Sequence, residues 1–436
     1  MDQTTTYEIP RLDVRHAFPW VHLFRAFRIA IDVRKLLLGA AALLLIAAGD
    51  WVFSFLPFAP DDMPAPWPWE HSFGYAPLPL RSLWADPWNA VVAIAGNWQI
   101  VLWPLWTVLD PALALMRPDL TWGGAALAWT RLFWAIAVWS VFGGAITRMA
   151  AVKFARDESL PMRSALKFSL ARFLSFFSAP LLPLAGIGFL WLLGMLGGLI
   201  GRIPAAGEPI VGALWVLPLL LAFAMALIVL ALAVSWPLMS ATISAEGSDA
   251  FDGFSRSFGF IFSRPWYALW LAIVALVYGS AVIFFVSAVT TLVAYLAEWS
   301  VSAGAGEERA DRLTATAPEL IDEDRPLILG EDLDRTADDA PLGTELAGFW
   351  LRALATLAAG FVASYFWTAV TIMYFLLRRH DDATRLDEVW LPEDDEQDDL
   401  LPLVGVAASD QEPIERPPVS KPIRQGNEAD ETEARR

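Results

Sequence analysis

Long runs of apolar residues, separated by polar segments, dominate the hydrophobic pattern of this chain. Six of these runs predict transmembrane helices, at about 36–56, 125–147, 178–200, 211–239, 267–296 and 347–377. About 20 consecutive apolar residues cross a hydrocarbon core that is roughly 30 Å thick. The pattern therefore predicts an all-α, polytopic membrane helix bundle with about six transmembrane helices.

A seventh apolar segment, 90–109, is also long enough to span a bilayer, but polar residues and a proline interrupt it. Asn97, Gln99 and Pro104 lie inside it, and Trp and Pro residues crowd around it. Tryptophan collects at membrane–water interfaces. We therefore predict an interfacial or re-entrant segment here, with a seventh span as the alternative.

Basic residues collect beside the ends of the predicted spans and indicate the topology. They are Arg25, Arg28, Arg34 and Lys35 before the first span; Arg148, Lys153, Arg156, Arg163, Lys167 and Arg172 between the second and third; Arg256 and Arg264 between the fourth and fifth; and Arg378, Arg379 and Arg385 after the sixth. Lys and Arg near span ends mark the cytoplasmic side. With six spans, all of these clusters fall on one side, which predicts cytoplasmic N- and C-termini.

Charge divides the chain further. The net charge is −17, and the segments 302–345 and 378–436 each contribute about −9, a composition typical of solvated, disordered chain. We predict a cytoplasmic N-terminal segment with an interfacial helix at 1–35, a six-span membrane domain at 36–377 with outer loops 57–124 and 302–345, and an acidic disordered cytoplasmic tail at 378–436. The first apolar run begins near Leu36 without the features of a signal peptide, so we expect a retained transmembrane helix.

Two segments that precede predicted spans resemble each other and indicate an internal repeat. Ser164–Pro180 aligns without gaps on Asp249–Pro265, and a looser third copy lies at Pro19–Lys35. Each copy has the pattern of a short amphipathic helix that lies in the membrane interface. We predict cytoplasmic interfacial helices that anchor the following hairpins; the alternative is a lipid-surface sensor or a gate.

The second copy places aromatic and charged residues on opposite faces. At 100° per residue, one face holds Phe251, Phe254, Phe258, Ile261 and Phe262, the other holds Asp249, Asp252, Arg256, Gly259 and Ser263, and Phe260 is off-pattern. Asp252 and Arg256 are spaced for an ion pair within the helix. Asp249 or Ser248 is expected to cap the helix N-terminus.

The first copy is basic. Arg163, Lys167 and Arg172 are candidate contacts for anionic lipid, because a Lys or Arg near an anionic membrane surface contributes about 1 kcal/mol. Ser159 is the expected N-cap, and Pro161 is expected in the first turn.

Residues able to carry out chemistry are scarce. The sequence has no Cys, and its four His residues lack metal-ligand spacing. The common zinc-protease, hydrolase and P-loop motifs are missing, so we predict no catalytic residue, no metal site and no cofactor. A nucleic-acid role is not expected, because no basic face can neutralise phosphates. The glycines of Gly194–Gly201 are interpreted as sites of close helix packing.

Two ionisable residues fall inside predicted spans at a similar depth. Asp50 lies about 22 Å along the first span from Lys35, and Arg131 lies about 25 Å along the second from Arg148. We predict that they pair, either to lock the first hairpin near the outer interface or to line a polar path.

Three stretches carry a resemblance: Phe142–Arg156, Glu246–Trp266 and Thr371–Val389. They resemble uncharacterised bacterial multi-pass membrane proteins built from amphipathic-elbow and hairpin units. A weaker likeness is to the membrane domain of glycerophosphodiester phosphodiesterases. The resemblance implies the same architecture and a bacterial cytoplasmic (inner) membrane, and it brings no catalytic residue to this chain.

The leading functional hypothesis is a non-enzymatic scaffold or accessory protein that engages membrane lipid and partner proteins. Its acidic loop or tail could contact a protein partner. The alternatives are a passive or lipid-type transporter and, third, a membrane-embedded enzyme. A polar path through the bundle would favour transport, whereas a dry, close-packed bundle would favour the scaffold.

Overall fold

The computed structural model of the protein describes residues 18–60, 67–68, 87–117, 119–204, 206–314 and 342–391. The chain divides into the units Met1–Trp390 and Leu391–Arg436, and all helices described below belong to the first unit. Within the described residues, every regular element is a helix and no strand occurs. The prediction of an all-α chain is therefore confirmed.

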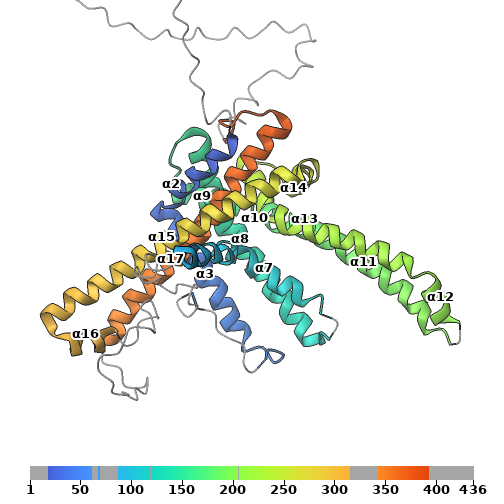
Figure 1. Ribbon diagram of the computed structural model, residues 1–436. Coiled ribbons are helices and arrows are strands. Elements are labelled where there is room, and N and C mark those ends of the chain that lie inside the picture. Colours follow the sequence, from blue (N-terminus) through green and yellow to red (C-terminus); the bar gives the residue numbers. More distant parts are fainter. Residues whose placement is uncertain are drawn as a thin grey trace, which may run out of the picture. The chain divides into compact units, whose positions relative to one another are not determined.

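Six helical stretches of the described chain are long and apolar enough to cross a membrane. They are α3 (Val33–Phe53), α8 (Trp122–Arg156), the stretch Phe173–Arg202, α13 (Val216–Glu246), α15 (Pro265–Ala305) and α17 (Leu342–Asp382). Phe173–Arg202 contains α10 (Phe173–Ser178), α11 (Leu181–Leu199) and η2 (Ile200–Arg202). The number and order of long apolar helices match the sequence prediction, and Figure 1 shows their arrangement.

Shorter helices connect the long ones. They are η1 (Pro19–Phe24), α2 (Arg25–Ala30), α5 (Pro87–Gly96), α6 (Trp98–Val101), α7 (Trp103–Ala114), α9 (Met162–Ala171), α12 (Gly207–Ala213), α14 (Ala250–Ser263) and α16 (Glu307–Thr314). The doubtful segment 90–109 is thus broken into α5, α6 and α7, and it is not among the candidate spans. Val101 and Val108 are buried, and the Thr107 hydroxyl accepts a 2.8 Å hydrogen bond from Trp139 Nε1. This segment therefore enters the packed interior rather than lying wholly on its surface.

Helix α17 is the central element of the first unit. Almost every residue from Ala355 to Arg378 is buried, and α17 packs against α3, α8, α13 and α15. A helix that is buried on all sides occupies the core of its bundle. Its polar side chains bond to neighbouring helices: Ser364 donates to the carbonyl of Ala30 at 2.7 Å, and Tyr365 donates to that of Ala275 at 2.7 Å.

The crossing of α3 and α17 brings two backbones into contact. A Cβ atom added to Gly39 would lie 2.4 Å from the carbonyl oxygen of Gly360. One added to Gly360 would lie 2.4 Å from the carbonyl oxygen of Leu36. Small residues allow this close approach between membrane helices, so each helix requires glycine at the crossing.

Tryptophan side chains pack against one another where α8, α13 and α17 meet. The ring centroid of Trp367 lies 5.5 Å from that of Trp139 and 5.4 Å from that of Trp236. All three side chains are buried and come from α17, α8 and α13. The interior where these helices meet is therefore occupied by aromatic rings.

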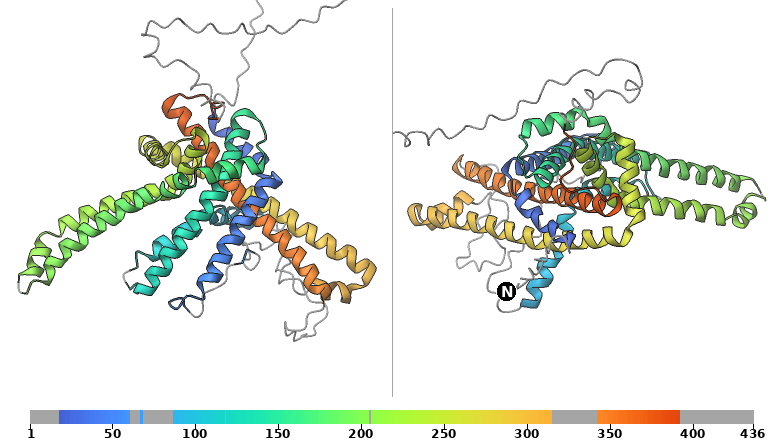
Figure 2. Two further views of the ribbon diagram at one scale, coloured as in Figure 1. Left: turned by 180° about the vertical axis from the view of Figure 1, so that it is seen from behind. Right: turned by 90° about the horizontal axis from the view of Figure 1, so that it is seen from above.

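Helices α11 and α13 form a hairpin through α12, and they lie side by side in Figure 1. Figure 2 shows the pair extending away from the helices around α17. Most of its side chains face outward; for example, Phe189 and Phe223 are 60% and 64% exposed. This hairpin is packed mainly on itself over most of its length.

The amphipathic segments before two of the long helices differ in detail from the prediction. Helix α14 buries Gly253, Ser257 and Phe260, whereas Phe251 and Phe262 of the predicted apolar face are exposed. Phe260, which lies off the predicted apolar face, thus packs on the interior side of the helix with Gly253 and Ser257. Small residues at 253 and 257 let α14 lie close to α13, where a Cβ on Gly253 would lie 2.9 Å from the Ile243 side chain.

The helix boundaries of these segments are also now defined. Asp249 caps α14 by accepting a 2.9 Å hydrogen bond from the backbone of Asp252, as predicted. The first copy is interrupted at Arg172, between α9 and α10. Pro161 is the N-cap of α9 and no side chain caps that end, so the expectation for Ser159 was wrong.

Substitution of Gly39 by Ala tests the backbone contact between α3 and α17. The added methyl group would force the helices apart, and overpacking of this kind costs about 1–3 kcal/mol. We expect a lower melting temperature in detergent, measured by circular dichroism. Gly186→Ala is the matched control, because a Cβ there meets nothing within 4 Å in the described structure. Equal stability of the two variants would contradict the packing argument.

Candidate functional site: the ionic cluster at the ends of α13 and α17

Arg148, Arg378 and Glu246, all buried or largely buried, lie where α13 ends and the last turns of α17 pass. Residue 247 is a glycine with φ of +64°, the left-handed conformation that ends α13 and reverses the chain into α14. A Cβ atom at this position would lie 2.6 Å from the Trp390 ring. Glycine is thus required both by the turn and by the close approach of Trp390.

Glu246, the last residue of α13, is the acidic centre of this cluster. Its Oε2 lies 2.6 Å from Arg256 NH1, and its Oε1 lies 3.6 Å from Arg378 NH1. The Tyr374 hydroxyl donates a hydrogen bond to Oε1. One carboxylate therefore joins α13, α14 and α17.

Arg378 also holds the chain that follows α17. Its NH2 donates to the backbone carbonyl of Glu388 at 2.6 Å and to that of Arg385 at 3.3 Å. Its side chain is only 6% exposed. A buried guanidinium needs compensating acceptors, and here Glu246 and these carbonyls provide them for NH1 and NH2.

Two further arginines bind the other side of the cluster. Arg148 is buried, and its NH1 donates to the carbonyl of Ser244 at 2.7 Å. Arg172 NH1 donates to the carbonyls of Gly247 and Ser248. Both guanidiniums lie near the rings of Phe168 and Trp390, the closest with Cζ 4.5 Å from the Phe168 centroid, which is a cation–π geometry.

Trp390 connects this arginine pair to α13. Its backbone N–H donates to the carbonyl of Ala245 at 2.8 Å, and its ring meets both guanidiniums. Residues 383–390, which follow α17, are therefore fixed to the cluster by the bonds of Arg378 and of Trp390. We call this stretch the C-terminal strap.

The bonds of this cluster link helices and the strap to one another. Its carboxylate and its cations bond to one another, to backbone carbonyls and to aromatic rings. Within the described part of the chain, no three His, Cys, Asp or Glu side chains are grouped to hold a metal ion. The arrangement favours holding α13, α14, α17 and the strap together.

Asp50 and Arg131 are brought together by α3 and α8. Arg131 Nε lies 2.8 Å from Asp50 Oδ1, and its NH2 lies 3.1 Å from Oδ2. Asp50 is buried, whereas the Arg131 side chain is 37% exposed. This bidentate geometry links the two helices; the choice between a lock and a polar path stays a prediction.

Asp252 and Arg256 do not pair in the described structure, which corrects the prediction of an ion pair within the helix. Arg256 turns instead to Glu246, and Asp252 is exposed. An exposed pair within a helix gives only about 0.3–0.5 kcal/mol, so the largely buried carboxylate of Glu246 is the stronger partner.

The candidate lipid contacts separate into two groups. Arg163 and Lys167 lie exposed on α9, where a membrane surface could reach them. The lipid contact of Arg172 stays a prediction, while its NH1 turns inward to the carbonyls of Gly247 and Ser248. The reason is the helix break at Arg172, which turns this side chain away from the face of α9.

Glu246, Arg378 and Trp390 were not predicted as site residues. Glu246 begins the aromatic stretch that leads into α14. Its position immediately before Gly247 was the one sequence feature that could have marked it as the end of a helix. Arg378 was interpreted only as a topology marker. The contacts of Trp390 join residues far apart in the chain, and no local pattern marks them.

No protein-family model matches the chain, and neither curated proteins nor solved structures give a match. The structure itself defines the class: a helical protein with six helices of membrane-spanning length and composition. The resemblance to elbow-and-hairpin membrane proteins stays a prediction.

Replacement of Glu246 by Gln tests the ionic cluster. The amide can still accept a hydrogen bond from Tyr374, but the charge opposite the buried Arg378 is lost. Breaking a buried ion pair in this way costs about 3 kcal/mol, and we expect a corresponding loss in chemical denaturation of the detergent-solubilised protein.

The matched control is Asp387→Asn, which removes a carboxylate from the exposed pair with Arg385. Solvent screens such an exposed pair, so its loss is expected to change stability little. If both variants unfolded alike, Glu246 would not be the centre of a stabilising cluster.

Proposed function

We propose that this protein is a non-enzymatic integral membrane protein that acts as a scaffold or accessory protein, engaging membrane lipid and partner proteins. The observation that carries the proposal is the hairpin of α11 and α13. Its two helices have the length and composition of membrane spans, yet most of their surface is uncovered by this chain. Lipid or another protein must cover such a surface.

One side of α11 supports contact with another helix. Gly194 and Gly198 are four residues apart and therefore share a face, and a Cβ at either would meet no described atom within 4 Å. Small residues at this spacing allow close packing between membrane helices. Elsewhere in the molecule such contacts are already used, as at Gly39 and Gly360.

The packed interior supports a scaffold over a transporter. The place where α8, α13 and α17 meet is filled by Trp139, Trp236 and Trp367. A transport path would need a polar cavity or a broken helix there. The acidic segments 302–345 and 378–436 remain proposed protein-contacting segments, although most of their residues lie outside the described structure.

We further propose that the protein resides in a bacterial cytoplasmic membrane with both termini in the cytoplasm. The grouping of Lys and Arg on one side of six spans supports this topology. A reporter of membrane topology fused after Gly330 is then expected to report an extracytoplasmic position. The same reporter fused after Pro402 is expected to report a cytoplasmic position. The reverse result would rule the topology out.

Capture of native complexes tests the functional proposal. The full-length protein, extracted in polymer-bounded lipid discs, is expected to retain a reproducible protein partner and membrane lipid, both identified by mass spectrometry. The double variant Gly194→Leu, Gly198→Leu is expected to lose most of the partner, because leucine blocks close helix packing.

Gly259→Leu is the control for this experiment. It adds the same side chain at an open glycine of α14, outside the hairpin. Equal loss in this variant would show that α11 is not the contact surface. Recovery of neither a partner nor lipid from the wild type would refute the scaffold proposal.

A further inference from the structure

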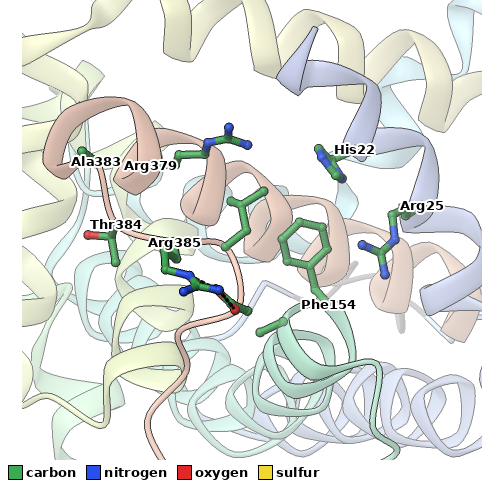
Figure 3. A pocket seen from close by; sticks show the side chains of 10 residues that line it. His22, Arg25, Phe154, Arg379, Ala383, Thr384 and Arg385 are labelled. Atoms are coloured by element: carbon green, nitrogen blue, oxygen red, sulfur yellow. Dashed lines mark hydrogen bonds and ion pairs between the residues drawn. The ribbon is translucent and has the colours of Figure 1, made fainter. Parts of the chain in front are cut away.

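A basic pocket lies between the N-terminal helices and the strap. It has a volume of about 450 Å³ and is lined from η1, α2, the end of α8, the end of α17 and the strap. His22, Arg25, Arg379 and Arg385 contribute its basic groups, and Asp387 is its acidic residue. Figure 3 shows His22 and Arg25 on one side, Arg379 and Arg385 on the other, and Phe154 between them.

The cations of this pocket come from separate parts of the chain. Arg25 begins α2, Arg379 lies in the last turns of α17, and Arg385 lies in the strap. The positive-inside pattern accounts for basic residues on this side of the membrane. It does not account for the convergence of three arginines around one hollow, which brings like charges together at an energetic cost.

Arg25 supports an anion in the pocket. Its Cζ lies 5.1 Å from the centroid of the Phe154 ring, and it forms no ion pair among the described residues, although its charge, after those of Lys153 and Arg28, helps to lower the pKa of Asp157. The ring fixes the guanidinium at the pocket wall. Its donor groups are therefore positioned for a ligand without a large entropic cost.

Asp387 shows which ligand geometry the pocket favours. Its two carboxylate oxygens accept hydrogen bonds of 3.0 and 2.8 Å from Nε and NH2 of Arg385. These hydrogen bonds, with a contribution from Arg156, hold the pKa of the Asp387 carboxyl below its ordinary value. A guanidinium offers the same fork to two oxygens of a phosphate.

We propose that this pocket binds a phosphate group, with Arg25, Arg379 and Arg385 as its ligands and Asp387 as an internal competitor. The phosphate belongs either to the headgroup of an anionic lipid or to a soluble phosphate compound. The lipid source rests on the proposed engagement of membrane lipid, whereas the soluble source does not. Entry of the ligand releases Asp387 from Arg385 and replaces one carboxylate with a group of higher charge.

Titration of the full-length protein in phosphatidylcholine discs tests the proposal. The probes are a short-chain phosphatidic acid and inorganic phosphate, and binding is measured by native mass spectrometry and calorimetry. Arg25→Gln and Arg379→Gln are each expected to weaken binding about fivefold, the effect of about 1 kcal/mol per basic group. Asp387→Asn is expected to strengthen binding, because the internal competitor is removed.

The control is Arg264→Gln, which removes one exposed charge between α14 and α15, outside the pocket. Unchanged binding in this control supports a specific site. If both probes bind and the pocket variants weaken both, the pocket recognises the phosphate group itself. If only the lipid binds, the pocket recognises the headgroup of an anionic lipid. Equal weakening in the control, or no saturable binding of either probe to the wild type, would overturn the proposal.

The capture experiment with the α11 variants shows separately whether the phosphate pocket or the proposed scaffold function is wrong. The pocket variants lie outside the α11–α13 hairpin, so they are expected to retain any protein partner. Loss of phosphate binding with an intact partner would therefore concern the pocket alone.

Discussion

The backbone contact between Gly39 and Gly360 is the constraint on which the arrangement of the other helices depends. It lets α3 lie directly against α17, and α17 is then free to receive α8, α13 and α15 on its remaining faces. Without side chains at the crossing, association relies on van der Waals contact and interhelical hydrogen bonds, as expected where lipid tails are as apolar as leucine. Ser364 and Tyr365 supply two of those bonds beside the crossing.

The positions of the long helices could be predicted from apolar run length, but their place in the bundle could not. Ser364, Tyr365 and Thr371 lower the apolar character of α17, yet this helix is enclosed over almost all of Ala355–Arg378. Helix α13, a nearly uninterrupted apolar run, is largely uncovered before its last turns. In a membrane, polar and small residues mark the interior and apolar residues mark the lipid side, so run length alone carries little information about burial.

The candidate site shows the same limit for charged residues. Asp50 and Arg131 could be paired from the sequence because both lie at a similar distance along adjacent spans of one hairpin. Arg256 could not be assigned, since its partner Glu246 lies beyond the turn at Gly247 and is fixed by Arg378 and Tyr374 of α17. The local pairing with Asp252 was the only one visible in the sequence, and a buried carboxylate shared by three groups outcompetes it.

The strap takes part in both the ionic cluster and the basic pocket. Different bonds serve the two sites, so a change in the pocket need not break the cluster. The strap backbone is held by Arg378 at Arg385 and Glu388, and by the bond from Trp390 to Ala245. The Asp387 side chain lies between these fixed points and is exposed. A ligand in the pocket therefore competes with an exposed pair that solvent screens, whereas breaking the largely buried pair that secures the strap costs about 3 kcal/mol. Ligand exchange at Arg385 can thus proceed by rotation of side chains, with α13, α14 and α17 still clasped.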